Sequence, residues 1–235
     1  MHQRGYRKEQ GEAPLKEHLA AALLIRSGWQ PTQPLFDPFC GSGTLLIEAV
    51  LMARNLAPGL KRVAFAFEKY ANFDMSLWSS MRAKALGERK AIAEGVRFVG
   101  SDLDPRQLEK AKQNANRAGI GEFIEFKLGD ATALESLATE IPGVIVTNPP
   151  YGERLGDLPT LIPIYAAFSL ALKQHFANWR LAIITSNSDL LRALKLSRLK
   201  SYKFNNGPLE CEFTLFDLTE KQVQISTAAP SIFFT

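Results

Sequence analysis

Pro34-Leu35-Phe36-Asp37-Pro38-Phe39-Cys40-Gly41-Ser42-Gly43-Thr44 joins a short apolar stretch to a loop with two glycines. Residues 34–39 are predicted to form a buried strand, and the apolar spacing of residues 44–55 predicts a helix directly after the loop. A glycine-containing turn between a strand and a helix is typical of parallel α/β sheets, which bind ligands at the carboxyl ends of their strands. This stretch therefore predicts both the fold class and the edge of the sheet that carries a site.

The same alternation of strands and helices continues along the chain. Further strands are predicted at residues 96–101, 123–128, 144–147 and 181–185, and further helices at 15–27, 105–117 and 160–176. Asp104 and Pro105 are expected to start the helix at 105–117, because Asp accepts hydrogen bonds from free helix N–H groups and Pro suits the first helical position. Gly119 and Gly121 are expected to end it.

Residues 198–218 contain two extended runs around Asn205-Asn206-Gly207-Pro208, which predicts an antiparallel hairpin with a loop longer than the tightest kind. Together these elements predict an α/β, Rossmann-like fold with a seven-stranded, mostly parallel sheet that ends in this hairpin. Residues 56–94 combine an aromatic-rich stretch with a charged helix around 76–94, and are predicted to be an insertion. The predicted organisation is a lead-in at 1–14, one domain at 15–220 and a linker or tail at 221–235.

The composition of the 235 residues is ordinary for a globular protein, with a small excess of basic side chains. The net charge is +4 and the isoelectric point is near 9.1. Basic residues cluster near both ends, which suits a phosphate-rich partner and equally suits a solvated surface: Arg4, Arg7, Lys8, Lys195, Arg198, Lys200 and Lys203. Two cysteines and three scattered histidines argue against a metal site, and no apolar run reaches the ~20 residues that span a bilayer. We therefore expect a cytoplasmic protein without a metal or a membrane segment.

The loop at residues 37–44 lacks the spacing of dinucleotide- and triphosphate-binding loops. Position 46 is Leu instead of the third glycine of Gly-x-Gly-x-x-Gly, and the loop has no Gly-Lys-Ser/Thr. A small cofactor with an amino-acid end fits better, because Asp37 can pair with its ammonium group, directly or through water. The first predicted cofactor-binding residues are Asp37, Pro38, Phe39, Cys40, Gly41, Ser42, Gly43 and Thr44.

Two more carboxylates follow the ends of predicted strands. Asp102 ends the second strand, where a carboxylate can accept both hydrogen bonds from a ribose diol, and Leu103 beside it can lie against an adenine ring. Asp130 follows the third strand and can accept a hydrogen bond from the adenine amino group, while the Ala131 N–H donates to a ring nitrogen. Because the carboxyl ends of parallel strands meet at one edge, these residues predict a single cofactor crevice.

The fourth predicted strand is followed directly by Asn148-Pro149-Pro150-Tyr151. Neither proline has an N–H for the strand ladder, so the chain must leave the sheet here. It then presents an amide, a carbonyl and an aromatic ring, which together suit a flat, amino-bearing substrate such as a nucleobase. A proline-rich turn with a packed Tyr is the alternative for the tetrapeptide alone. The neighbouring carboxylates favour a site, so Asn148, Pro149, Pro150 and Tyr151 are predicted to be catalytic, with Asn148 also beside the cofactor.

In their order along the chain, the motifs at 37–44, 101–104, 129–131 and 148–151 resemble those of class I S-adenosylmethionine-dependent methyltransferases. The Asn-Pro-Pro-Tyr form resembles the branch that methylates exocyclic amino groups of bases. Arg4-Gly5-Tyr6-Arg7 followed by Ala13-Pro14-Leu15-Lys16-Glu17 resembles the segment that joins an RNA-binding THUMP domain to its methyltransferase domain. With the stretches at 148–155 and 206–209, the chain is similar to the bacterial 23S rRNA guanine-N2 methyltransferase family, in particular to the N-terminal module of its bifunctional members.

This resemblance implies that S-adenosylmethionine (SAM) is the cofactor and that unfolded or partly assembled 23S rRNA is the substrate. It also implies an RNA-binding THUMP domain that is absent from this chain. Asn148 and the Pro149 carbonyl would accept the two N–H bonds of guanine N2, while Tyr151 stacks on an unstacked base. The residues expected to contact RNA or cofactor are Arg4, Tyr6, Arg7, Lys16 and Arg154, and for Lys16 ordinary surface exposure fits equally well.

Other functions remain open at the level of sequence. Asn-Pro-Pro-Tyr does not separate guanine N2 from adenine N6, or rRNA from tRNA, because each target presents a similar amino group. A non-catalytic RNA-binding module with a vestigial cofactor fold predicts decayed motifs, and here they are intact. Methylation of a protein glutamine amide is disfavoured by the basic flanks.

Overall fold

The computed structural model describes residues 4–7, 15–152 and 158–219, and a seven-stranded sheet forms its centre. The strands are β1 (Leu35–Asp37), β2 (Phe98–Asp102), β3 (Ile124–Leu128), β4 (Val144–Thr147), β5 (Arg180–Thr185), β6 (Arg198–Asn206) and β7 (Leu209–Asp217). They lie in the order β3-β2-β1-β4-β5-β7-β6. Strands β1 to β5 are parallel, and β7 runs antiparallel to both β5 and β6. The predicted Rossmann-like sheet with a C-terminal antiparallel hairpin is confirmed.

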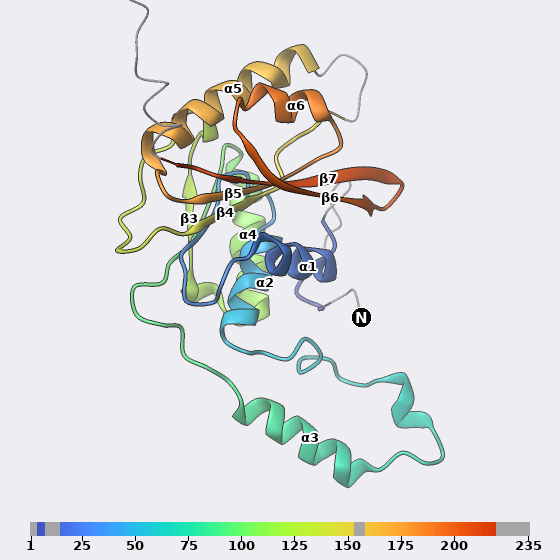
Figure 1. Ribbon diagram of the computed structural model, residues 1–235. Helices are drawn as coiled ribbons and strands as arrows, with labels where there is room; N and C mark the ends of the chain where they lie inside the picture. The colour runs from blue at the N-terminus through green and yellow to red at the C-terminus, as the bar shows by residue number, and fades with distance from the viewer. Residues whose placement is uncertain (1–3, 8–14, 153–157, 220–235) are drawn as a thin grey trace, which may run out of the picture.

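Helices cover both faces of the sheet (Figure 1). One layer contains α1 (Glu17–Ser27), α2 (Thr44–Ala53) and α4 (Pro105–Ala118), and the other contains α5 (Leu158–His175) and α6 (Ser188–Ala193). Strand β4 shows how the layers are held, because Val144 and Val146 pack in the core under the first layer while Ile145 packs under the second. A strand buried on both faces needs apolar residues at every position, which explains the continuous apolar runs in the sequence.

The ends of α4 follow the sequence signals closely. Asp104 Oδ1 accepts a hydrogen bond from Arg106 N at 2.9 Å, and Pro105 occupies the first turn. Gly119 ends the helix in the left-handed conformation, with a φ of 71°. Gly121 instead begins the short 3₁₀ helix η2 (Gly121–Phe123), so Gly119 alone terminates α4.

The hairpin loop is shorter than the sequence predicted. Asn206 pairs with Leu209, so that only Gly207 and Pro208 connect β6 to β7. Gly207 has a φ of +66°, which the first central residue of a tight hairpin turn requires, and the fixed φ of proline suits the second. The expectation of a longer loop was wrong because the asparagines extend the strand instead of the turn.

Residues 56–94, here called the arm, leave the C-terminal end of α2 and extend away from the sheet (Figure 1). The arm contains the 3₁₀ helix η1 (Ala66–Lys69) and α3 (Met75–Gly87), and no residue of α3 is buried. Its root is closed by two hydrogen bonds, from Lys90 N to Arg54 O at 2.9 Å and from Asn55 Nδ2 to Glu88 O at 3.0 Å. The predicted helix at 76–94 therefore ends early, at Gly87, because the chain must turn back to this closure.

Within the described ranges, no helix is both long and apolar enough to cross a membrane. The same ranges contain no group of three or more His, Cys, Asp or Glu side chains placed to hold a metal ion.

Candidate functional site

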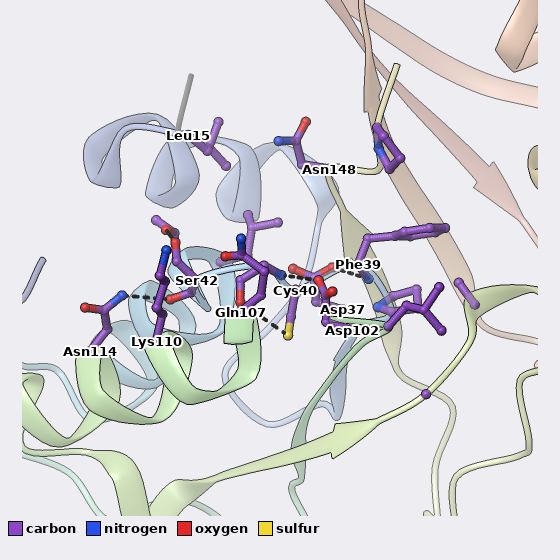
Figure 2. Close-up of a pocket in the computed structure, with 18 of the residues that line it drawn as sticks. Leu15, Asp37, Phe39, Cys40, Ser42, Asp102, Gln107, Lys110, Asn114 and Asn148 are labelled. Atoms are coloured by element: carbon purple, nitrogen blue, oxygen red, sulfur yellow. Dashed lines mark hydrogen bonds between the residues drawn. The ribbon is translucent and has the colours of Figure 1, made fainter. Parts of the chain in front are cut away.

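A cavity of about 1000 Å³ lies beyond the carboxyl ends of β1, β2 and β4 (Figure 2). The sequence-predicted residues that line it are Asp37, Pro38, Phe39, Cys40, Gly41, Ser42, Thr44, Asp102, Leu103, Asp130, Ala131, Asn148 and Pro150. The structure thus brings together residues from four separate motifs, as the argument from strand ends predicted. The volume of this cavity is at the upper end of the range for small-molecule sites, which leaves room for a cofactor and part of a second ligand.

The loop between β1 and α2 is held in place by hydrogen bonds to its backbone. Asp102 Oδ2 accepts from Gly41 N at 2.9 Å, and the side chain of Asn114 donates to Ser42 O at 3.0 Å. Gly41 and Gly43 both have positive φ, of 50° and 80°. A Cβ on Gly41 would meet no atom within 4 Å, whereas one on Gly43 would lie 3.1 Å from Ala111 Cβ. Gly41 is therefore open to the cavity, and Gly43 permits α2 to pack closely against α4.

Asp37 is a buried carboxyl group in the wall of the cavity, with 2% of its surface exposed. Both hydrogen bonds that it accepts reach Oδ1, from Thr147 Oγ1 at 2.7 Å and from Phe39 N at 3.2 Å. Burial raises the pKa of Asp37 to about 7, although these two hydrogen bonds act to lower it. A cationic ligand group near Oδ2 would replace the lost hydration and favour the ionised form.

The carboxylates at the end of β2 and after β3, Asp102 and Asp130, each accept hydrogen bonds from backbone N–H groups. Asp102 lines the cavity, and its Oδ1 accepts from Asp104 N at 2.9 Å while its Oδ2 accepts from Gly41 N. Asp130 Oδ1 accepts from Thr132 N and Thr132 Oγ1, at 2.8 and 2.7 Å. Leu103 is 70% exposed and lines the cavity, so an apolar surface lies beside the two carboxylates. This combination fits a ribose and a flat purine ring.

Asn148 Oδ1 and Arg7 Nε are buried atoms of cavity-lining residues that have no hydrogen-bond partner among the described residues, and of the two only Asn148 Oδ1 is an acceptor. A buried acceptor without a donor costs about 1–3 kcal/mol, so such atoms are rare, and a ligand that donates a hydrogen bond to Oδ1 would remove this cost. The turn that carries Asn148 is fixed by Tyr165, whose hydroxyl donates to Pro150 O at 3.2 Å.

Tyr151 does not face the cavity, contrary to the role in base stacking that the sequence suggested. Its side chain is 7% exposed and packs in the core cluster between the sheet and α5, and neither Tyr151 nor Pro149 lines the cavity. The physical reason is that the chain turns at the two prolines, which directs the ring back to the apolar layer. Phe39 is the aromatic residue that lines the cavity instead, and its ring meets Phe168 edge-on at 5.3 Å.

The lead-in residues expected to contact RNA are largely used inside the protein. Arg4 forms a salt bridge with Glu48 of α2 at 3.1 Å, and the Tyr6 hydroxyl donates to the other oxygen of Glu48, also at 3.1 Å. Tyr6 is 3% exposed and so offers no surface to RNA in this structure, whereas Arg4 lines a second, smaller cavity. Arg7 does line the cavity, where its guanidinium donates to Leu15 O at 3.0 Å and to Thr44 Oγ1.

The two remaining predicted contacts have different outcomes. Lys16 is exposed at the start of α1 and is not among the residues that line the cavity. Arg154 lies outside the described residues.

Sequence reasoning missed one wall of the cavity, which one face of α4 provides. Its residues are Gln107, Lys110, Gln113, Asn114 and Arg117, spaced three or four apart. Asn114 is buried in line with the apolar residues Ala111 and Ala118. A polar residue at an otherwise apolar helical position was the signal that could have identified it.

The strand order, the glycine loop and the carboxylates at successive strand ends define the fold of class I SAM-dependent methyltransferases. Within this class, the chain belongs to the RMKL-like methyltransferase domain family, whose model matches residues 4–214.

Known proteins with similar sequences and structures agree with this assignment. The ribosomal RNA large subunit methyltransferase K/L of Pseudoalteromonas translucida is 47% identical over 227 residues, which are 96% of this chain and 32% of the relative. The chain spans about a third of the length of the curated relatives it matches.

Two crystal structures show the same fold over most of the chain. One is SMU.472, a candidate methyltransferase complexed with SAH, with a TM-score of 0.84, 34% identity, and coverage of 92% of this chain and 55% of that one. The other, from Listeria monocytogenes, is described as a predicted N6-adenine-specific DNA methylase, with a TM-score of 0.81, 34% identity, and coverage of 92% and 54%.

Proposed function

We propose that this chain is a catalytic module that transfers a methyl group from SAM to the N2 amino group of a guanine in 23S rRNA. The observation that carries the proposal is the buried, unpartnered Oδ1 of Asn148 beside a cavity with cofactor-binding features. Support for the substrate comes from the K/L-named relatives at 47% identity, and support for the cofactor comes from the SAH held by the structural relative.

The residues around the cavity fit the parts of SAM. Asp37 would hold the ammonium group, the backbone at Gly41 would lie against the methionine portion, and Asp102 would accept from the ribose hydroxyls. Leu103 and Asp130 would contact the adenine ring and its amino group. Each of these residues lines the cavity. SAM would supply an activated methyl group on a positively charged sulfur.

Asn148 would act on the amino group of the base. The lone pair of guanine N2 is delocalised into the ring, so the nitrogen is a poor nucleophile in the free base. An acceptor at Oδ1 would hold an N–H bond of the amino group out of the plane of the ring and help to localise the lone pair, whereas Pro149, the second acceptor expected from the sequence, is not among the residues that line the cavity. Alignment of the two reactants then supplies much of the rate, and the proton that is released after transfer passes to water.

The face of the base would lie against Phe39 and Pro150, which line the cavity, instead of against Tyr151. Tyr151 would act as a buried anchor of the turn. The bases of a folded RNA are stacked, so the target must be extruded before it can enter.

The test is nucleoside analysis by mass spectrometry, after incubation of the protein with labelled SAM and unmodified 23S rRNA or tRNA. We expect labelled N2-methylguanosine from 23S rRNA. Labelled N6-methyladenosine would show that the target base is adenine and not guanine. Label in tRNA alone would show that the substrate is tRNA and not rRNA. Binding of SAM without label in either RNA would refute the proposal as a whole.

A further inference from the structure

A second, smaller cavity of about 180 Å³ lies at the root of the arm, where α2 and α4 end. Four basic side chains line it, from four separate segments: Arg4, Arg54, Lys61 and Arg89. No Asp or Glu is among its described lining residues. The two cavities share no lining residue, although they meet at the C-terminal end of α4, where Arg117 lines the first and Ala118 and Gly119 line the second.

The charges at this root are only partly compensated within the protein. Arg4 is paired with Glu48, and Lys61 Nζ donates to Arg117 O at 2.8 Å, at the C-terminal end of α4. Arg54 Nε is buried without a hydrogen-bond partner among the described residues, and its guanidinium lies 4.4 Å from the centre of the Phe123 ring. The pKa of Lys61 is lowered by burial and by the charge of Arg89. Like charges are therefore held close enough here to destabilise one another.

Helix ends explain only part of this arrangement. A helix C-terminus carries roughly half a negative charge, which favours nearby cations, and α2 and α4 both end here. Apart from Arg4, which is paired with Glu48, the basic side chains of the cavity are Arg54, Lys61 and Arg89. Of these three, Lys61 donates to a carbonyl at the end of α4. Arg54 and Arg89 still converge on a cavity without an acidic residue among its described lining, and an anion from outside the described chain would neutralise them.

The surroundings indicate which anion fits. The arm contains seven Lys or Arg residues against four Asp or Glu, so its net charge of +3 is most of the +4 of the whole chain. Arg117 joins the two cavities, because its side chain lines the cofactor cavity while its carbonyl binds Lys61. Lys110 lies farther along the same face of α4. Basic residues thus follow α4 from the cofactor cavity to the root of the arm, a spacing that suits a polyanion.

We propose that Arg54, Lys61 and Arg89 form a binding site for a backbone phosphate of the substrate RNA, and that the arm places this site in the path of the RNA. The inference rests on the proposed function for the identity of the polymer. The site would hold RNA in position without reading a base, because phosphate contacts carry no sequence information.

The test compares two double variants, each of which removes one Lys and one Arg and therefore two positive charges. Lys61→Gln/Arg89→Gln removes two cations of the site, and Lys112→Gln/Arg192→Gln removes an exposed Lys and an exposed Arg elsewhere on α4 and α6. Binding of a fluorescent fragment of unmodified 23S rRNA is followed by anisotropy over a range of salt concentrations. SAM affinity is measured by calorimetry in parallel.

We expect Lys61→Gln/Arg89→Gln to weaken RNA binding about fivefold to tenfold and to reduce the slope of log K against log salt by about 1.4, since each phosphate contact to a single strand contributes about 0.7. SAM affinity should stay unchanged. The control pair should alter the slope by less than half as much.

Equal slopes for the two double variants would overturn the phosphate site, and so would an absence of RNA binding by the unaltered protein at low salt. These outcomes are separate from failure of the proposed function. That failure shows as an absence of labelled nucleoside, whereas the salt slope is measured without any methyl transfer.

Discussion

The ionisation of Asp37 should control the affinity for SAM. In the cofactor-free protein, burial raises the pKa of Asp37 to about 7. The ammonium group of SAM would favour the ionised carboxylate, so the pKa of Asp37 should fall on binding. Below pH 7 the free protein must therefore release a proton before it can bind the cofactor well, and affinity should rise with pH.

The magnitude follows from the ionised fraction of the free protein. With a pKa of about 7, Asp37 is roughly one tenth ionised at pH 6 and roughly nine tenths ionised at pH 8. The affinity for SAM should then increase about tenfold over this interval, equivalent to about 1.4 kcal/mol. Close to one proton should be released for each SAM bound at pH 6, and close to none at pH 8.

Calorimetry in two buffers with different ionisation enthalpies measures both the affinity and the proton release. The matched control is Asp37→Asn, because an amide oxygen at the position of Oδ1 can still accept from Thr147 and Phe39. This variant should bind SAM more weakly at pH 8 and should lose the proton release assigned to Asp37. It also reports any pH dependence that comes from the amino group of SAM itself.

Two results would refute the reasoning about Asp37. One is an affinity of the unaltered protein that does not change between pH 6 and pH 8. The other is the same pH dependence in Asp37→Asn. The stability of the cofactor-free protein gives an independent check of sign: a carboxyl whose pKa is raised on folding stabilises the fold at low pH, and this contribution is lost as the pH rises through about 7.

Three further predictions concern the turn at Asn148, the contact of Asp102 with the loop at Gly41, and the contact of Glu48 with the lead-in. Asn148→Ala should reduce methyl transfer at least ~10²-fold, measured by single-turnover kinetics, and leave SAM affinity nearly intact, because it removes an acceptor that acts in the transition state; near-normal turnover would exclude the role assigned to Asn148. Asp102→Ala should weaken SAM binding in calorimetry, since it removes both the ribose acceptor and the partner of Gly41 N; unchanged affinity would mean that the ribose lies elsewhere. Glu48→Ala should lower the free energy of unfolding by about 3 kcal/mol, because it removes the buried carboxylate that pairs with Arg4 and accepts from Tyr6, and Tyr6→Phe by about 1 kcal/mol, both measured by denaturant titration. Equal stabilities would show that the lead-in is not held by Glu48.

The parts of the fold that follow from local sequence were predicted well. Strand β4 has the predicted limits, and α4 begins at the predicted capping residue, because apolar runs end sharply at polar or proline residues. One wall of the cavity was predictable for the same reason, since Asp37 and Asp102 occupy the last positions of β1 and β2. Parallel strands then bring distant residues to one edge without any further information.

Local sequence does not reveal partners that are remote along the chain. Arg4 is close to Arg7 and Lys8 in the sequence, whereas its ion-pair partner Glu48 is 44 residues away. The turn residues alone suggest that Tyr151 lies in the cavity, whereas its ring packs in the apolar cluster that also contains Leu161 and Tyr165 of α5. The short helix α6, with six residues and two buried leucines, offers too little periodicity to be recognised.

The closure at the root of the arm has a consequence for how this chain could change over evolutionary time. The backbone enters and leaves the arm through neighbouring residues that are joined by hydrogen bonds, from Lys90 to Arg54 and from Asn55 to Glu88. A segment attached in this way can lengthen, shorten or be exchanged as one piece while the strand order and the cofactor loop stay as they are. In the proposed role of the arm, contacts with RNA would diverge among related proteins through this segment alone, while the proposed chemistry at Asn148 would stay the same.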